Sequence, residues 1–238
     1  MRFFKHVSPF KVISFDLDDT LYDNTEVIYR AEVEFSRFLQ KKYSLPDYAD
    51  YSFWAQCKSR VLTTDRDFDD DVTLLRAYGI MAGMYNLGHE IELEEALELV
   101  DTFVKIRSDI KISDEVMSLL KDLKQHYELV AMSNGNVSLE HLGLDGIFSM
   151  NVRPCYKKLK RKPHADMFNH LSESLNVPLR EIMHVGDEPY SDVKGAVLAN
   201  CQCAFLDRGY AKKLKGLESI SNLPNVVLDN IFELRNFI

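Results

Sequence analysis

The sequence predicts an α/β fold, a doubly wound parallel sheet into which a separate helical domain is inserted. Two observations predict the sheet: short apolar segments end in small or acidic residues, and helical patterns separate the later ones. A third observation predicts the insertion, because between about residue 22 and about residue 110 the apolar residues recur only at helical spacing. One strand therefore precedes the long helical stretch, and alternating helices and strands follow it.

Four segments are predicted as buried parallel strands because they form short, nearly continuous apolar runs. They cover residues 11–15, 128–132, 182–185 and 203–206. Strands of this kind are buried on both faces, so helices must cover both sides of the sheet.

Helices are predicted before the second, third and fourth of these strands, where apolar residues lie three or four positions apart. In order along the chain, the three patterns are Val116, Leu119, Leu120 and Leu123; Met167, Phe168, Leu171 and Leu175; and Val193, Ala196 and Val197. The alternation of these helices with strands is what a doubly wound sheet requires.

The helical stretch divides the chain into two expected units. We expect residues 1–21 and 111–238 to form a Rossmann-like core and residues 22–110 to form the helical domain. Asp23 or Asn24 can cap the first helix of that domain. The inward residues of its first and last helices are Val27, Ala31, Phe35 and Phe38 or Leu39, and then Leu93, Ala96, Leu97, Val100 and Val104.

An acidic patch lies between these two helices and consists of Asp65, Asp67, Asp69, Asp70 and Asp71. A solvated loop with a helix cap is the favoured interpretation, because unpaired charges prefer water. A calcium site is the alternative. It would lack the glycine and the final glutamate of an EF-hand loop.

Composition and charge exclude several classes of function. The chain has 238 residues, of which 46% are apolar and 28% charged, as in ordinary folded proteins of one or two domains. Its formal charge of -8 gives no general attraction to nucleic acid or to anionic membranes. We find no export signal and no apolar run of about 18 residues, so we expect the protein in the cytoplasm. The four cysteines form no CxxC pair and are expected to be reduced thiols.

Three carboxylates and a hydroxyl follow the first predicted strand, in Asp16-Leu17-Asp18-Asp19-Thr20. Aspartate favours helix caps and turns, so the cluster alone has a structural explanation. Ligands of an open α/β sheet, however, bind beyond the carboxyl ends of its strands. We therefore expect Asp16, Ser133 and Asp187 to converge on one crevice.

Oxygen ligands for a hard cation are available at these strand ends. Asp16 and Asp187 supply two carboxylates, and Asp192 follows five residues after Asp187. Because Mg²⁺ is usually held by one or two carboxylates with waters and substrate phosphates, the sequence predicts a magnesium site. The ion would also offset repulsion between the acids.

Two further segments suit a phosphate group. Ser133-Asn134-Gly135 offers a hydroxyl, an amide and backbone N–H groups, although a helix cap with a turn glycine is favoured for the tripeptide alone. Lys162-Pro163 is expected to start the helix that runs through Met167 to Leu175, because proline suits a first helical position. A lysine there gains nothing from the helix dipole unless it faces an anion together with the helix end.

A run of basic residues precedes Lys162 and consists of Lys157, Lys158, Lys160 and Arg161. A solvated basic loop is the favoured interpretation, and steering of a phosphate group is the alternative. Neither interpretation requires nucleic acid.

Four motifs, in their order and spacing, resemble those of the haloacid dehalogenase-like hydrolase superfamily. They are Asp16-Leu17-Asp18-Asp19-Thr20, Ser133-Asn134-Gly135, Lys162-Pro163 and Gly186-Asp187-Glu188-Pro189-Tyr190-Ser191-Asp192. The helical stretch resembles the cap domain of that superfamily's first cap class. More closely, residues 15–24, 133–136, 175–178 and 184–187 are similar to segments of bacterial flavin mononucleotide phosphatases.

The resemblance implies a Mg²⁺-dependent phosphomonoesterase. Asp16 would attack phosphorus and form an aspartyl phosphate, while Asp18 would protonate the leaving oxygen and later activate water. Asp187, Asp192 and the backbone carbonyl of Asp18 would complete the metal site. The expected phosphate contacts are Ser133, Asn134, Lys162 and Thr20, with a structural turn role as the alternative for Thr20.

The resemblance also implies the substrates, flavin mononucleotide and 5-amino-6-(5-phospho-D-ribitylamino)uracil. Asp18 argues against dehalogenation, which attacks carbon and needs no acid for the leaving group. Two alternatives stay open: another small-metabolite phosphatase, and a non-catalytic module that binds a phosphorylated metabolite.

Aromatic residues in the helical stretch are candidates for contact with a substrate ring, although burial in a helical core is favoured for each of them. They are Tyr22, Tyr29, Phe35, Phe53, Trp54, Phe68, Tyr78 and Tyr85. The sequence does not predict the oligomeric state.

Overall fold

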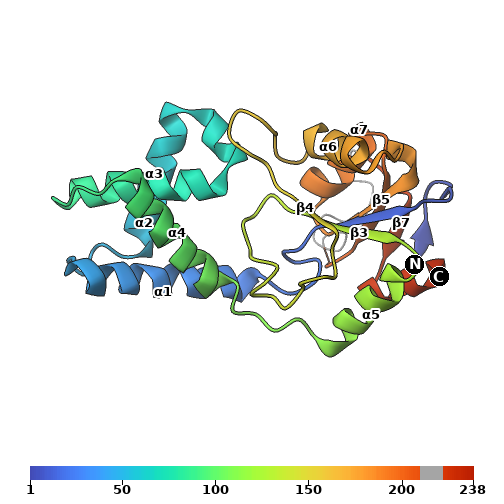
Figure 1. The fold of residues 1–238 in the computed structure, drawn as a ribbon, viewed down its shortest axis with the longest axis horizontal. Helices are drawn as coiled ribbons and strands as arrows, with labels where there is room; N and C mark the ends of the chain where they lie inside the picture. Colours follow the sequence, from blue (N-terminus) through green and yellow to red (C-terminus); the bar gives the residue numbers. More distant parts are fainter. Residues whose placement is uncertain (210–221) are drawn as a thin grey trace.

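The protein is built around a seven-stranded sheet in a computed structural model that describes residues 1–209 and 222–238 (Figure 1). The strands are β1 (Arg2–Phe3), β2 (Val12–Phe15), β3 (Glu128–Met132), β4 (Met150–Val152), β5 (Ile182–Gly186), β6 (Gln202–Leu206) and β7 (Val226–Leu228). Their order is β1-β7-β6-β5-β2-β3-β4, and only the β1–β7 pair is antiparallel. The predicted α/β class is therefore confirmed.

The four predicted strands are present, each within one residue of its expected ends. β2 shows why a continuous apolar run predicts such a strand, because all four of its residues are buried. Val12 packs on one face of the sheet, whereas Ile13 and Phe15 pack on the other. The strands that the sequence did not predict, β1, β4 and β7, are only two or three residues long.

Helices cover both faces of the sheet (Figure 1). On one face lies α5 (Asp114–Lys124), whose predicted apolar residues are all buried and whose first turn is capped by Ser113. On the other lie α6 (Asp166–Leu175), the π-helix η3 (Pro189–Lys194) and α7 (Gly195–Leu198). Short 3-10 helices complete this layer arrangement at η2 (Leu179–Glu181) and η5 (Ile231–Phe237).

Between β2 and α5 the chain forms a group of helices that stands beside the sheet, on the left of Figure 1. We call this group the helical unit; it consists of α1 (Thr25–Tyr43), α2 (Tyr51–Thr64), η1 (Arg66–Asp70), α3 (Val72–Asn86) and α4 (Leu93–Arg107). It has an apolar core of its own. Of the predicted stripe on the first helix, Ala31, Phe35 and Leu39 are buried.

The last helix of the unit is rotated slightly from the expected face. Ala96 and Val100 are buried as predicted, but Leu99 and Phe103 share that face, while Leu97 and Val104 are half-buried. A helix that packs on two neighbouring helices has a wide buried face. The predicted stripe of apolar residues was therefore narrower than the face that is buried.

One ion cluster lies inside the helical unit. Glu32 of α1 accepts hydrogen bonds from both terminal nitrogens of Arg76, at 2.9 and 2.7 Å, and one from Lys58 at 2.7 Å. The Arg76 guanidinium also lies over the Phe103 ring, 3.3 Å from its centroid. Burial raises the pKa of Glu32, but Arg76 and Lys58 outweigh it and lower that pKa to about 2.

All four cysteines are free thiols, as expected. Burial raises the pKa of three of them: those of Cys57 and Cys203, and that of Cys201 to about 12. Within residues 1–209 and 222–238, no helix combines the length and the apolar character needed to cross a membrane.

Candidate active site

One pocket opens at the carboxyl ends of the central strands. β5, β2 and β3 are neighbours, so the residues that follow them meet at one edge of the sheet. Seven of the eight predicted site residues line this pocket: Asp16, Asp18, Ser133, Asn134, Lys162, Asp187 and Asp192. The convergence expected from the strand ends is therefore present.

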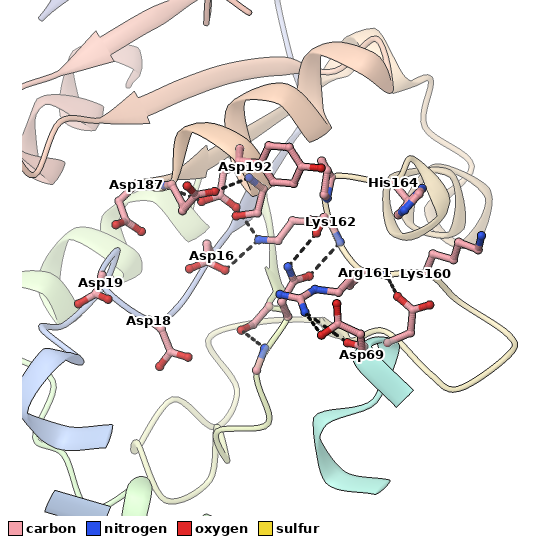
Figure 2. A pocket seen from close by; sticks show the side chains of 18 of the residues that line it. Asp16, Asp18, Asp19, Asp69, Lys160, Arg161, Lys162, His164, Asp187 and Asp192 are labelled. Carbon is pink, nitrogen blue, oxygen red and sulfur yellow. Dashed lines mark hydrogen bonds and ion pairs between the residues drawn. The ribbon is translucent and has the colours of Figure 1, made fainter. Parts of the chain in front are cut away.

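Lys162 lies at the centre of a buried ion cluster (Figure 2). Its Nζ donates to Asp16 Oδ1 at 2.8 Å, to Asp192 Oδ1 at 2.7 Å and to the carbonyl of Met132 at 2.8 Å. The lysine side chain is 1% exposed. Three acceptors thus satisfy the three donors of a buried ammonium group.

The pKa values in this cluster follow from burial and from Lys162. Burial opposes the charged form of Lys162, but Asp16 and Asp192 outweigh it, and its pKa is raised. For Asp192, Lys162 and His184 outweigh burial and lower the pKa. Burial, followed by the charge of Asp192, raises the pKa of Asp16 well above its usual value despite Lys162.

Three carboxylates of the pocket fit a divalent cation. Asp16, Asp187 and Asp192 each place a carboxylate oxygen within 4.8 Å of those of the other two. Burial, and then the charge of Asp192, raises the pKa of Asp187 to about 7. A cation among these oxygens would relieve that repulsion, and three hard oxygen donors suit Mg²⁺.

Asp192 reaches this position because Gly186 has no side chain. A Cβ at Gly186 would lie 2.3 Å from Asp192 Cγ, a distance that atoms do not tolerate. The backbone N–H of Glu188 donates to Asp192 Oδ2 at 3.0 Å, and His184 Nε2 lies 3.2 Å from Oδ1. The first turn of η3 therefore holds the carboxylate against the end of β5.

Asp18 has different surroundings from Asp16. In Figure 2 its carboxylate points away from the cluster of Asp16 and Lys162. Arg107 Nη2 donates to both of its oxygens, at 2.7 and 2.9 Å, and the Tyr22 hydroxyl donates to Oδ1 at 2.6 Å. Burial and the charge of Asp18 raise the pKa of Tyr22, so the phenol keeps its proton.

Gly135 makes room for this carboxylate. A Cβ at Gly135 would lie 2.9 Å from Asp18 Oδ2 and 3.3 Å from both Arg107 Nη1 and Ser133 Oγ. A side chain at this position would push against the second oxygen of Asp18. The glycine of the predicted tripeptide is thus needed for this close approach, whereas no helix follows the tripeptide and the favoured interpretation of a helix cap with a turn glycine was wrong.

Asn134 holds the backbone of Lys162. Its Oδ1 accepts from the N–H of Lys162 at 2.9 Å, and its Nδ2 donates to the carbonyl of the same residue at 3.0 Å. Ser133 Oγ accepts from the N–H of Gly135 at 3.0 Å. Both side chains line the pocket, and Asn134 also fixes the chain that carries the lysine.

Thr20 lies behind the pocket and is not among the described residues that form its wall. Its side chain is fully buried, and its hydroxyl donates to Asp187 Oδ1 at 3.1 Å. The sequence suggested a phosphate contact for Thr20. The structure instead gives it a contact with a carboxylate of the cluster, because the turn after β2 directs it inward.

Lys162 does not start a helix, so that expectation was wrong. α6 begins at Asp166, and Lys162 belongs to the loop before it. Arg161 is held through its N–H by Asp70 at 2.8 Å, and Lys162 is held by Asn134. These contacts fix the loop in a non-helical path, which proline alone could not indicate.

The acidic patch and the basic run are not simply solvated, because they meet each other. Asp65 accepts from the Tyr156 hydroxyl at 2.5 Å and lies 3.6 Å from Lys157 Nζ. Arg161 Nη1 donates to Asp69 Oδ1 at 2.6 Å. These contacts connect η1, and Asp65 just before it, to residues 155–161 at the pocket.

Most of the aromatic residues of the helical unit pack against other side chains and do not line the pocket. Phe35 and Trp54 are buried, and Phe68 stacks on Tyr156 with ring centroids 4.7 Å apart. Tyr190, in the fourth predicted motif, is the aromatic residue found in the described pocket lining, and it is 60% exposed.

Sequence reasoning missed Arg107 and Tyr22 as partners of Asp18. Tyr22 is four residues from Asp18, but Arg107 is separated from it by 89 positions. A basic residue at the inward position of α4, among apolar neighbours, was the signal that could have indicated a buried charge partner.

The fold and this site are those of a hydrolase family, as comparison with known proteins shows. A model of the haloacid dehalogenase-like hydrolase family matches residues 10–200. The chain therefore belongs to that family. The resemblance inferred from the four motifs and the expectation of an enzyme are both confirmed.

Individual relatives span most of the chain. The 5-amino-6-(5-phospho-D-ribitylamino)uracil phosphatase YigB of Escherichia coli K12 is 33% identical over 210 residues, which cover 87% of each protein. A 2-haloacid dehalogenase structure from Pseudomonas syringae is 26% identical, covers 95% of this chain and 97% of its own, and gives a TM-score of 0.79. A phosphatase structure of the family from Thermococcus onnurineus has the same fold, with 19% identity, a TM-score of 0.63, and coverage of 95% of this chain and 97% of its own.

Proposed function

We propose that this hydrolase is a phosphomonoesterase that acts through an aspartyl phosphate on Asp16. The observation that carries the proposal is the cluster of Asp16, Asp187, Asp192 and Lys162 at the carboxyl edge of the sheet. Burial raises the pKa of Asp16 despite Lys162, and a divalent cation bound to this carboxylate would favour its ionised form, which can attack phosphorus. The activity named for the relative from Escherichia coli supports the same class.

Each step has a residue to perform it. An Asp16 oxygen attacks phosphorus, and the bond from phosphorus to the leaving oxygen breaks as Asp18 donates a proton to that oxygen. Asp18 then takes a proton from water as the water attacks the aspartyl phosphate, which regenerates Asp16 and releases phosphate. General acid and base help of this kind contributes about 10²- to 10⁴-fold in rate.

The charge of the phosphoryl group needs several donors. The Ser133 hydroxyl and backbone N–H groups around Gly135 would face its oxygens. Lys162, whose three donors are taken within the buried cluster, would act on the phosphoryl group through its positive charge. Asp16, Asp187, Asp192 and the carbonyl of Asp18 would hold Mg²⁺, which when bound neutralises part of the phosphoryl charge. Thr20 would act by holding Asp187, with which it is hydrogen bonded.

For the substrate, we propose a riboflavin precursor phosphate or flavin mononucleotide. The named substrate of the relative from Escherichia coli is 5-amino-6-(5-phospho-D-ribitylamino)uracil. The pocket has a volume of roughly 660 Å³, which suits a ligand with a sugar chain and a ring. Tyr190 would offer a face to that ring.

Asp18 favours phosphate ester hydrolysis over the dehalogenation named for the relative from Pseudomonas syringae. An alkoxide needs a proton in order to leave, whereas a halide leaves as the free ion. The non-catalytic alternative is disfavoured because no group required for the two steps is missing.

The remaining parts of the proposal concern organisation. We propose that residues 22–110 act as the cap over the core formed by 1–21 and 111–238, and that they select the substrate by closing over the pocket. The contacts of Asp65 and η1 with residues 155–161 support this placement. A small phosphorylated metabolite as the partner and the cytoplasm as the location belong to the same proposal.

A panel of purified phosphate esters, assayed with and without Mg²⁺, tests the function. We expect hydrolysis that a chelator abolishes, and kcat/KM highest for the two riboflavin-pathway esters. Asp16→Asn should reduce hydrolysis below detection while the thermal unfolding temperature stays within a few degrees of the parent. Ordinary turnover by that variant would reject the mechanism, and equal kcat/KM across the panel would reject only the substrate.

A further inference from the structure

The contact of Arg107 with Asp18 assigns a role to a residue that the proposed reaction does not yet use. We propose that Arg107 is a positioning residue, which holds the Asp18 carboxylate where it can act on the leaving oxygen. The proposal rests on the proposed function, since it concerns the acid and base of that reaction. Arg107 would not touch the substrate itself.

The cost of burying Arg107 supports a role beyond packing. The residue is 4% exposed, and its buried Nε has no hydrogen-bond partner within residues 1–209 and 222–238. A buried polar atom without a partner destabilises a protein. Its two terminal nitrogens are instead committed to Asp18, through Nη2, and to Asn136 Oδ1, through Nη1 at 3.2 Å.

Further contacts fix the guanidinium itself. Asn136 follows the predicted tripeptide on the core side, and its Nδ2 donates to Thr73 Oγ1 of α3 at 3.2 Å. Arg107 is the last residue of α4. The guanidinium is therefore held from the helical unit and from the loop after β3 at the same time.

The direction of Asp18 suits the far side of the phosphoryl group. Attack by Asp16 requires the leaving oxygen to lie roughly in line, on the opposite side of phosphorus. In Figure 2 the Asp18 carboxylate is turned away from Asp16, although both residues line the same pocket. Arg107 contacts both Asp18 oxygens and Tyr22 contacts one, so the carboxylate cannot rotate without losing them.

Substrates with different leaving groups test this role. An alkyl phosphate needs a proton from Asp18, whereas the nitrophenolate of p-nitrophenyl phosphate leaves without one. For Arg107→Met we expect kcat/KM to fall by about 10- to 100-fold with glycerol phosphate or flavin mononucleotide, as misplacement of a catalytic group does. With p-nitrophenyl phosphate we expect a fall of about threefold or less. Arg107→Lys should recover part of the loss on the alkyl esters.

Arg76→Met is the matched control, because Arg76 is also a buried arginine of the helical unit but binds Glu32. It should affect both substrate types equally. An equal loss on both types for Arg107→Met, or a bias for Arg76→Met as strong as that for Arg107→Met, would overturn the proposal. If Arg107→Met does not fold, Tyr22→Phe removes a different contact to Asp18 and should show a weaker bias in the same direction, with an equal loss again overturning it.

A variant of Asp18 separates this inference from the function on which it rests. In an Asp18→Asn background, assayed at high enzyme concentration, adding Arg107→Met should change kcat/KM for the alkyl ester by about twofold or less, because both residues act through one carboxylate. Full additivity would contradict the inference. Activity retained by Asp16→Asn would defeat the proposed function instead, whereas an inactive Asp16→Asn with an unaffected Arg107→Met would defeat only the role of Arg107.

Discussion

Two of the ion pairs of this molecule, one at the sheet edge and one between the helical unit and the loop of residues 155–161, differ in burial. At the sheet edge, Lys162 and Asp192 are each 1% exposed. In the wall of the pocket, Arg161 and Asp69 form a similarly short contact, but their side chains are 35% and 55% exposed. The first contact lies within the core, and the second connects the core to the helical unit.

This difference in burial indicates which ion pairs stabilise the fold. A buried ion that loses its partner is left without water or counter-charge, at a cost of about 3–5 kcal/mol. An exposed ion that loses its partner is hydrated again, at a cost of about 0–1 kcal/mol. The buried set should therefore fix the structure of the site, while the exposed set can separate and reform.

Removing the buried ammonium group should give the largest effect. For Lys162→Met we expect a loss of about 3–5 kcal/mol in the free energy of unfolding without metal, because Asp16 and Asp192 lose their counter-charge. Chemical denaturation at neutral pH measures this loss. Lys158→Met, at an exposed lysine of the same loop, is the control and should change the free energy by about 0.5 kcal/mol or less. Similar losses in the two variants would contradict the comparison.

The ion cluster of the helical unit tests whether burial has the same consequence away from the pocket. The pKa of Glu32 is lowered to about 2 in the folded chain, so its ion pairs stabilise the protein above the unfolded-state pKa, near 4.5. That stabilisation is lost as the pH falls from about 4.5 to about 2. We expect Glu32→Gln to be less stable than the parent by about 3 kcal/mol at neutral pH, with the difference shrinking through this pH window. Urea unfolding of both proteins at several pH values measures it, and a difference independent of pH would show that the charge of Glu32 is not its source.

The exposed contacts should give the smallest effect. For Asp69→Asn we expect a change of about 1 kcal/mol or less in the free energy of unfolding, and this change should fade as salt is added. Denaturation at low and at high ionic strength measures both quantities. A loss as large as that of Lys162→Met would mean that the contact between η1 and the core is as important to the fold as the buried cluster.

The strand ends explain why so much of the site was predictable. Asp16, Ser133 and Asp187 each follow an apolar strand, and parallel strands bring such residues to one edge whatever lies between them. The same rule applied to Asp192, which is close to Asp187 in the sequence. Local sequence patterns thus predict which side chains meet, and the sheet determines how far apart they lie.

Contacts between the helical unit and the rest of the chain were not predictable in the same way. The pairing of Arg107 with Asp18, and of the acidic patch with residues 155–161, depends on how the helical unit lies against the core. No periodicity in the sequence records that arrangement. Lys162 shows a third limit, because proline fitted a helix start while the side chain of Asn134, far away in sequence, held the loop in another path.

The helical unit leaves the sheet after β2 and returns through α5 to β3, the strand next to it. An excursion that begins and ends at adjacent strands leaves their pairing unchanged, whatever its length. An insert of another size or shape could replace this one while Asp16 and Ser133 kept their spacing. In such an architecture, recognition can diversify without disturbing the reactive groups, provided that the replacement also supplies a partner for Asp18.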